Sequence, residues 1–301
     1  MKTIVLKADV DTYRGTKEGV PRLLRLFQSR GVNATFLFSL GPDHTGRALK
    51  RVFRPGFMKK VSRTSVLEHY GLKTLLYGTL LPGPDIGRSL ADILRMTEAG
   101  GFETGIHCWD HIGWQDGVSG ANPEWTRRQL RLAADRFREI FGHPAITHGA
   151  AGWQMNAAAY REEQEMGLQY ASDVRGTAPF RPVVDGQALG CIQLPTTLPT
   201  LDEVLGTGDL VPDNVHRHLI AATSEEREFG HVYTLHAELE GMRLLPAMER
   251  MLDAWQAMGY RILSLGELYR SLDPGRLPRH RIAIGEVPGR SGLLSIQGDL
   301  A

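Results

Sequence analysis

The stretch Thr3-Ile-Val-Leu-Lys-Ala-Asp-Val-Asp11 decides the fold of this chain. Aliphatic and β-branched residues predominate in it, which predicts a strand over Thr3–Val10, with the carboxylates of Asp9 and Asp11 at its end. A helix is expected from near Thr16, because the following apolar residues keep the helical i, i+3, i+4, i+7 spacing: Val20, Leu23, Leu24 and Phe27. A second apolar strand is expected at Ala34–Ser39.

Strand and helix patterns alternate through the rest of the chain. The further strands expected are Phe102–Ile106, Ala145–His148, Gln169–Asp173, Val232–His236 and Arg261–Ser264, and the further helices Ile86–Ala99, a long one from Pro123 to about Phe141, and Met242–Met258. Such alternation favours a parallel α/β architecture, either open or closed into a barrel. We expect one domain over residues 1–272, interrupted by an insertion at about 42–84, and an irregular tail over 273–301 that is rich in Pro, Gly and Arg.

Composition sets few limits on function. The 301 residues are 42% hydrophobic and 23% charged, with a formal net charge of +1, so no overall field selects nucleic acid. Two cysteines, Cys108 and Cys191, are too few for a disulfide framework and fit a reducing compartment. The first residues lack the apolar run of a signal peptide, and no apolar run is long enough to span a membrane, which predicts a cytoplasmic protein.

Several polar residues fall at the expected ends of strands, where α/β barrels gather their catalytic groups. His107 and His111 are spaced i, i+4, which on a helical turn would point both imidazoles the same way. Together with a carboxylate from Asp9 or Asp11, they would make a three-ligand site for a divalent metal. His236 could act as a general acid, because the pKa of imidazole is near working pH. Capping or surface histidines and a turn-forming aspartate pair are the structural alternatives.

In this order the motifs resemble the polysaccharide deacetylase (NodB-homology) family. The matching elements are Asp9-Val-Asp11, His107-x-x-x-His111, His148-Gly-Ala-Ala-Gly152, Asp173 and Leu235-His236. The resemblance implies a distorted, incomplete (β/α) barrel and one divalent metal ion (Zn, Co, Ni, Mn or Fe). It also implies Asp9 as the base, Asp11, His107 and His111 as metal ligands, and His236 as the acid.

Two departures from the family pattern concern the residues around the base. The family usually has adjacent aspartates in its first motif, whereas Val10 separates them here. An arginine of the third motif usually braces the base; His148 stands at that place, and Arg175 is the expected substitute. Asp173 is expected either to orient His236 or to pair with Arg175.

Longer strings are similar to one branch of the family, which deformylates a formamido-arabinose carried by undecaprenyl phosphate. They include NATFLFSLGPDHTGRAL from residue 33, GIHCWDHIGWQD from residue 105 and TLHAELEG from residue 234. That resemblance implies a metal-dependent amide hydrolase whose amino-sugar lipid product serves lipid A modification and polymyxin resistance. A soluble chitooligosaccharide or peptidoglycan deacetylase and a non-catalytic metal- or sugar-binding module are the alternatives.

The insertion has a charge pattern suited to a membrane surface. Residues 47–73 carry eight basic residues and one acid, Glu68, and Phe53 and Phe57 fall on the apolar side of a possible helix. At about 1 kcal/mol per basic residue near anionic lipid, such a segment predicts peripheral binding to the inner face of the inner membrane. A solvated basic helix, or a flap packed on the barrel, is the alternative.

Overall fold

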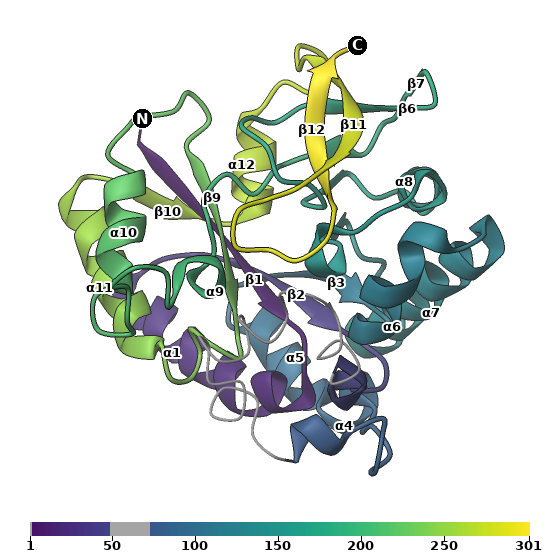
Figure 1. Cartoon of the computed structure of the whole chain (residues 1–301), viewed down its shortest axis with the longest axis horizontal. Coiled ribbons are helices and arrows are strands. Elements are labelled where there is room, and N and C mark those ends of the chain that lie inside the picture. Colours follow the sequence, from purple (N-terminus) through teal and green to yellow (C-terminus); the bar gives the residue numbers. More distant parts are fainter. Residues whose placement is uncertain (1, 49–72) are drawn as a thin grey trace.

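A computed structural model describes residues 2–48 and 73–301 (Figure 1). Most of the basic insertion, with Phe53 and Phe57, lies outside the described residues. The strands are β1 (Thr3–Val10), β2 (Thr35–Ser39), β3 (Glu103–Cys108), β4 (Thr147–His148), β5 (Tyr170–Ala171), β6 (Arg181–Val184), β7 (Gln187–Ala188), β8 (Ile192–Gln193), β9 (His231–His236), β10 (Arg261–Leu263), β11 (Arg279–Gly285) and β12 (Leu294–Leu300). The helices are α1 (Val20–Arg30), α4 (Ile86–Ser89), α5 (Ala91–Ala99), α6 (His111–Gly117), α7 (Pro123–Phe141), α8 (Ala157–Glu165), α9 (Leu201–Val204), α10 (Val215–Ala222), α11 (Leu245–Ala257) and α12 (Leu265–Ser271).

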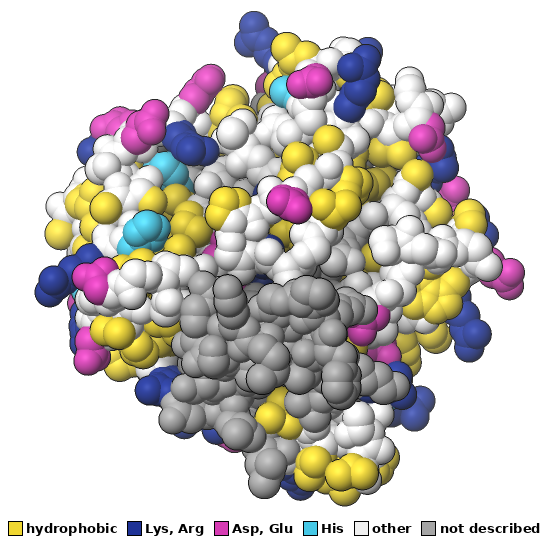
Figure 2. Space-filling model, in the orientation of Figure 1, with side chains coloured by type: hydrophobic (Ala, Val, Ile, Leu, Met, Phe, Trp, Pro, Cys, Tyr) yellow, Lys and Arg dark blue, Asp and Glu magenta, His cyan; other side chains and the backbone are white. Residues whose placement is uncertain are grey.

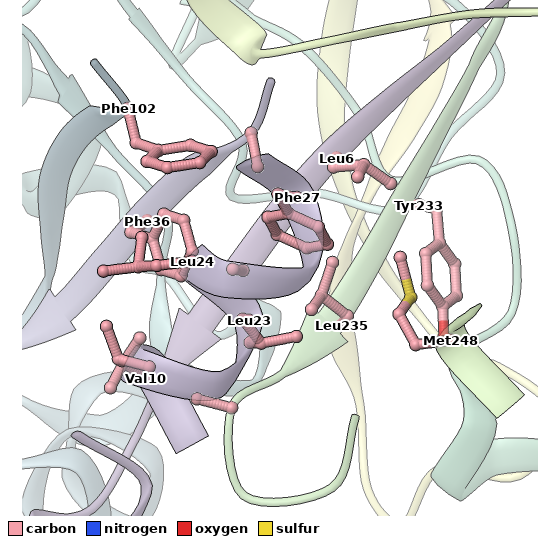
Figure 3. Close-up of a cluster of buried hydrophobic side chains, with 14 of the residues drawn as sticks. Leu6, Val10, Leu23, Leu24, Phe27, Phe36, Phe102, Tyr233, Leu235 and Met248 are labelled. Carbon is pink, nitrogen blue, oxygen red and sulfur yellow. The ribbon is translucent and has the colours of Figure 1, made fainter. Parts of the chain in front are cut away.

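The larger sheet is entirely parallel and is built around β1. Its order is β10-β1-β2-β3-β4-β5-β8, and β9 also pairs with β1. All eight residues of β1 are buried, as expected for a strand covered on both faces. Ile4, Leu6, Ala8 and Val10 belong to the main hydrophobic core, which Figure 3 shows between α1 and the sheet. Phe27 of α1 packs there against Phe36 and Phe102.

The sheet curls into a barrel that almost closes. After β8, the N–H groups of Thr197 and Leu198 donate to the carbonyl oxygen of Val232 in β9, at 3.0 and 3.2 Å. The Val232 N–H donates in return to the Thr197 hydroxyl at 2.9 Å. The two ends of the sheet therefore meet through a short segment instead of a full strand ladder. This geometry confirms the expected distorted, incomplete barrel.

The expectation of an irregular tail was wrong. β11 and β12 form an antiparallel hairpin, and β11 pairs in parallel with β6 to give a second sheet of order β12-β11-β6-β7 (Figure 1). The hairpin escapes a periodicity argument because β11 alternates only between exposed and half-buried residues. Its partner β6 is also about one hundred residues away in the sequence, so local pattern carries no information about the pairing.

Local details also differ from expectation. The helix expected over Ile86–Ala99 is two helices, α4 and α5, because Leu90 departs from helical geometry between them. The long helix to Phe141 is confirmed, with the Asn122 side chain accepting the Trp125 N–H at its start. Within the described residues, no helix is both long and apolar enough to span a bilayer.

Candidate metal centre and proton-transfer groups

Three side chains converge at the carboxyl ends of the central strands. Asp11 follows β1, His107 lies in β3 and His111 begins α6. The Nε2 atoms of His107 and His111 lie 3.2 and 3.3 Å from the two carboxylate oxygens of Asp11. The structure therefore brings together the three residues expected to hold a metal. The expected reason was incorrect, because His107 belongs to a strand and not to the same helical turn as His111.

Backbone contacts set the orientation of His107. Its Nδ1 lies 2.6 Å from the Gly149 carbonyl oxygen, which can only accept, so Nδ1 carries the proton and Nε2 keeps its lone pair for a metal. Buried Oδ1 of Asp11 accepts no hydrogen bond among the described residues. Burial would raise the pKa of Asp11, but His111 and His107 outweigh it and hold that pKa far below the ordinary value. This donor set fits a divalent cation with an open coordination position.

The loop that carries Asp11 is held by a buried carboxylate. Glu238 Oε1 accepts the N–H groups of Asp11 and Thr12 and the Thr12 hydroxyl, at 2.8–3.0 Å. Burial, with Asp11 nearby, raises the pKa of Glu238 well above its ordinary value. The next N–H, that of Tyr13, donates to Asp43. Since these three N–H groups are engaged, none of them is available to a developing oxyanion.

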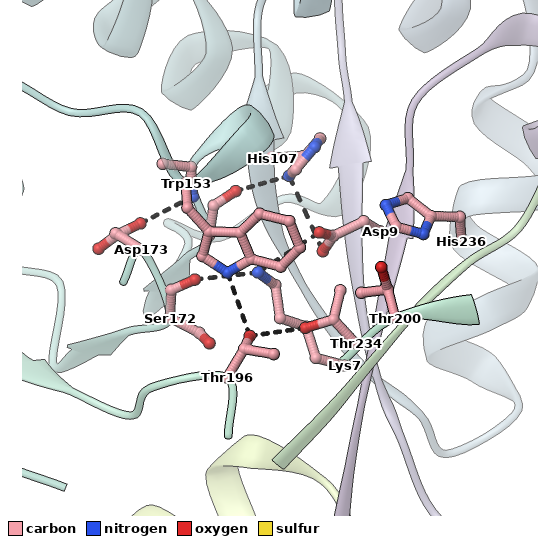
Figure 4. Close-up of polar contacts among 12 residues, drawn as sticks. Lys7, Asp9, His107, Trp153, Ser172, Asp173, Thr196, Thr200, Thr234 and His236 are labelled. Atoms are coloured by element: carbon pink, nitrogen blue, oxygen red, sulfur yellow. Dashed lines mark hydrogen bonds and ion pairs between the residues drawn. The ribbon is translucent and has the colours of Figure 1, made fainter. Parts of the chain in front are cut away.

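Asp9 occupies a different position from Asp11. It is buried at the end of β1, and its Oδ2 lies 3.4 Å from the Nζ of Lys7, a lysine with no exposed side-chain surface (Figure 4). Its Oδ1 lies 3.9 Å from His107 Nδ1, the nitrogen already committed to Gly149. Asp9 is thus adjacent to the candidate metal centre but is not among its three convergent ligands. Lys7, and not Arg175, supplies the cation beside it.

His236 ends β9 and lies beside Asp9 (Figure 4). The two residues are register partners in the β1–β9 ladder. Glu240 accepts the backbone N–H of His236 at 2.9 Å, and its other oxygen accepts the Tyr233 hydroxyl. The Nδ1 atom of His236 lies 3.9 Å from Oδ1 of Asp202 and makes no hydrogen bond within the described part of the chain.

Asp173 makes neither of the contacts expected of it. It lies instead in a buried group with His148, at 3.0 Å, and accepts the N–H of Ala150 and the amide of Gln193. Burial disfavours a charged His148, but Asp173 and Glu163 outweigh this and raise the pKa of His148 to about 10. Because Ala150 follows Gly149, Asp173 supports the turn whose carbonyl group orients His107. Its place is behind the metal centre, not beside His236.

Arg175 lies in a second network. Its guanidinium pairs with Glu203, donates to the Leu198 carbonyl oxygen and lies 4.9 Å from the centre of the Trp153 ring. Lys7 lies over the same ring at 5.1 Å, and Arg290 at 4.6 Å. The expected contact between Arg175 and Asp9 or Asp173 is absent from the described contacts of Arg175.

Sequence reasoning overlooked several residues around the site: Lys7, Trp153, Asp202, Glu203, Glu238, Glu240 and Arg290. Lys7 had a readable signal, because it lies two residues before Asp9 and so shares its face of the strand. Glu238 and Glu240 follow His236 closely within TLHAELEG. The other residues meet the site only through long-range packing.

Similarity to known proteins agrees with this geometry. The chain is 35% identical over 295 residues to a protein of Shewanella sediminis named as 4-deoxy-4-formamido-L-arabinose-phosphoundecaprenol deformylase ArnD, covering 98% of this chain and 94% of that one. The chain belongs to the ArnD deformylase family. A second ArnD protein, from Wigglesworthia glossinidia brevipalpis, is 30% identical, with 94% of this chain and 98% of that one covered. A search of protein-family models gave no match.

Solved structures of polysaccharide deacetylases share the fold of this ArnD-family barrel. A Mycobacterium smegmatis protein named as a polysaccharide deacetylase superposes with a TM-score of 0.64 at 16% identity, covering 95% of this chain and 96% of that one. A family 4 acetyl xylan esterase from Clostridium thermocellum, solved with a cobalt ion, gives 0.53 at 13% identity, with 92% and 97% covered. At these identities the likeness shows the fold alone.

Proposed function

We propose that this protein removes the formyl group from 4-deoxy-4-formamido-L-arabinose linked to undecaprenyl phosphate, giving the 4-amino sugar lipid and formate. The product is the amino-sugar lipid that serves lipid A modification and resistance to polymyxin. The observation that carries the proposal is the convergence of Asp11, His107 and His111 next to Asp9 and His236, in a chain that aligns over nearly its full length with ArnD proteins.

A divalent cation held by Asp11, His107 and His111 would polarise the formyl carbonyl and lower the pKa of the attacking water. Asp9 accepts the proton of the attacking water, while Lys7, 3.4 Å away, holds the carboxylate of Asp9 in place. His236 gives a proton to the sugar nitrogen as the carbon–nitrogen bond breaks, so that the amine does not leave as an anion. Asp9 and His236 carry out the two proton transfers from adjacent strands. Asp173 and His148 act only through the turn that orients His107.

Formate release from the lipid-linked sugar tests this assignment. Protein treated with a chelator should be inactive, and activity should return with one equivalent of Zn, Co, Ni, Mn or Fe, the best of which identifies the preferred metal. N-acetylated chitooligosaccharide is the matched control substrate. Faster deacetylation of that sugar than deformylation would favour the soluble deacetylase alternative, and metal binding without turnover of either would favour a binding module.

On this proposal, the insertion over about 42–84 meets the anionic membrane surface and admits the lipid-linked substrate. The first described end of the insertion attaches beside the site: Asp43 accepts the Tyr13 N–H, and His44 lies 2.7 Å from Asp110, whose side chain caps α6. Leu75 and Tyr77 are buried, so the apolar stretch does not face outward as a whole. Leu80 is 81% exposed at its turn, and hydrophobic side chains lie beside the grey segment in Figure 2.

The membrane part of the proposal has its own test. Replacing Lys59, Lys60 and Arg63 with Gln should weaken flotation with anionic vesicles and reduce its salt sensitivity, because these charges are screened by salt. A triple change of the exposed Arg25, Arg88 and Arg128 to Gln removes the same charge elsewhere and is the control. Deformylation of a short, water-soluble formamido-sugar phosphate should survive in both variants. Equal flotation of wild type and the insertion variant would end the electrostatic part of this proposal.

A further inference from the structure

A chain of polar contacts connects the imidazole of His236 with the C-terminal hairpin. Asp202, the second residue of α9, lies 3.9 Å from His236 Nδ1. Arg290, in the turn between β11 and β12, lies 3.3 Å from Asp202 and donates through Nε to Glu203 at 2.7 Å. We propose that Asp202 positions His236 for proton donation and that Arg290 positions Asp202, so that the C-terminal hairpin completes the acid side of the active site.

The proposal rests on the assignment of His236 as the acid in the proposed function. Nδ1 of His236 is buried and makes no hydrogen bond to the residues described, while Glu240 fixes only the backbone of this residue. Among the described residues, the carboxylate of Asp202 approaches this ring nitrogen, at 3.9 Å. At 3.9 Å the pair is too long for a hydrogen bond, but such contacts commonly shorten when substrate is bound. A carboxylate at Nδ1 orients the ring and stabilises imidazolium, which leaves Nε2–H for the substrate.

Arg290 has the geometry to fix that carboxylate. One guanidinium contacts Asp202 and Glu203, and its Nη2 also donates to the Thr200 hydroxyl at 3.1 Å. Thr200 and Glu203 form the capping box of α9, so Arg290 holds both the helix start and the carboxylate it presents. A lysine offers a single ammonium and cannot reproduce this forked set of contacts.

The two neighbouring arginines favour the ionised form of Glu203. Burial would raise the pKa of Glu203, but Arg290 and Arg175 more than offset it and hold that pKa below the ordinary value. Arg290 is further confined by the Trp153 ring, 4.6 Å away. Asp173, which was expected either to orient His236 or to pair with Arg175, is instead committed to His148 and Ala150. On this proposal Asp202 has the role toward His236 that was one of the two expected of Asp173.

Two substrates with different leaving groups can distinguish a variant that mispositions the acid from one whose structure is damaged. A sugar amine must be protonated as it departs, whereas 4-nitrophenolate leaves without a proton. Asp202→Asn, Arg290→Lys and Arg290→Ala should each lower kcat for the formamido sugar about tenfold or more, with little change in KM. Their hydrolysis of 4-nitrophenyl formate, measured above chelated enzyme, should stay within about twofold of wild type. Arg281→Ala, an exposed arginine on the same hairpin, is the matched control and should keep both rates.

His236→Ala distinguishes the two levels of inference. It should lose about 10²–10⁴-fold on the formamido sugar and little on the ester. If it does so while Asp202→Asn and Arg290→Ala match wild type on both substrates, the positioning proposal is wrong and the acid assignment stands. Equal losses on sugar and ester in the Asp202 and Arg290 variants would mean a structural role and also overturn it. Equal losses on sugar and ester in His236→Ala would contradict the assignment of His236 as the acid.

Discussion

Asp9 and His236 are register partners on the adjacent parallel strands β1 and β9, and the Ala237 N–H donates to the Asp9 carbonyl oxygen at 3.0 Å. The backbone ladder therefore fixes the separation of the two proposed proton-transfer groups. Neither residue depends on a loop for its position. Side-chain changes at either place should leave the ladder intact.

We expect Asp9→Asn and His236→Ala each to lower kcat by about 10²–10⁴-fold, the usual contribution of a positioned acid or base. Both variants should keep the wild-type circular dichroism spectrum and one bound metal per chain, because the convergent ligands are Asp11, His107 and His111. Metal content by mass spectrometry and formate release are the two measurements. Loss of the metal in Asp9→Asn would mean that the roles of Asp9 and Asp11 are reversed.

Alanine in place of Asp11, His107 or His111 should lower metal occupancy and activity together. In the wild type the ligand atoms of these three residues all lie within 4.8 Å of one another. Each change removes one of them and leaves two protein ligands. His143→Ala is the control, since that histidine pairs with Glu98 on the exposed surface. Stoichiometric metal in His107→Ala, measured after equilibrium dialysis, would exclude His107 as a ligand.

Lys7 should matter for both stability and rate. Lys7→Met keeps the length of the side chain but leaves Asp9 buried without its cation, and breaking a buried pair typically costs about 3–5 kcal/mol. Adding Asp9→Asn should recover part of that loss, because the unpaired charge is removed. Urea unfolding of the wild type, both single variants and the double variant measures the coupling. Strictly additive free energies of unfolding would show that the two side chains do not stabilise each other.

Lowering the pH should reduce the stability of the folded protein, partly through protonation of Glu203. Its folded-state pKa is lowered, so its contribution to stability is complete above the unfolded value of about 4.5 and disappears as pH falls through the folded value. Glu203→Gln should therefore be less stable than wild type at pH 7, with the difference shrinking towards pH 3. Unfolding midpoints in urea, measured with chelator so that metal ligands do not contribute, test this. A difference that stays constant from pH 7 to 3 would contradict it.

Features that depend on local sequence could be predicted, whereas contacts between residues far apart in the sequence could not. The limits of β1 were predicted correctly, because aliphatic and β-branched residues predominate from Thr3 to Val10. The convergence of Asp11 with His107 also followed, since parallel strands bring their carboxyl ends to one edge. Arg290 could not be predicted, because its approach to Asp202 depends on the pairing of β11 with β6. Lys7 was overlooked because a charged residue inside an apolar strand is usually read as an interruption.

The alternation along β1 ties correct folding to a working site. Leu6, Ala8 and Val10 belong to the helix-covered core, while Lys7 and Asp9 point to the other face. A slip of one residue against β2 or β9 would exchange the two faces, forcing an ammonium and a carboxylate into the hydrophobic layer. A misregistered chain therefore cannot keep its core and lose only its chemistry. For this strand, the penalty for mispairing comes from the same two charges that the proposed reaction uses, so these side chains also disfavour a misregistered pairing of β1.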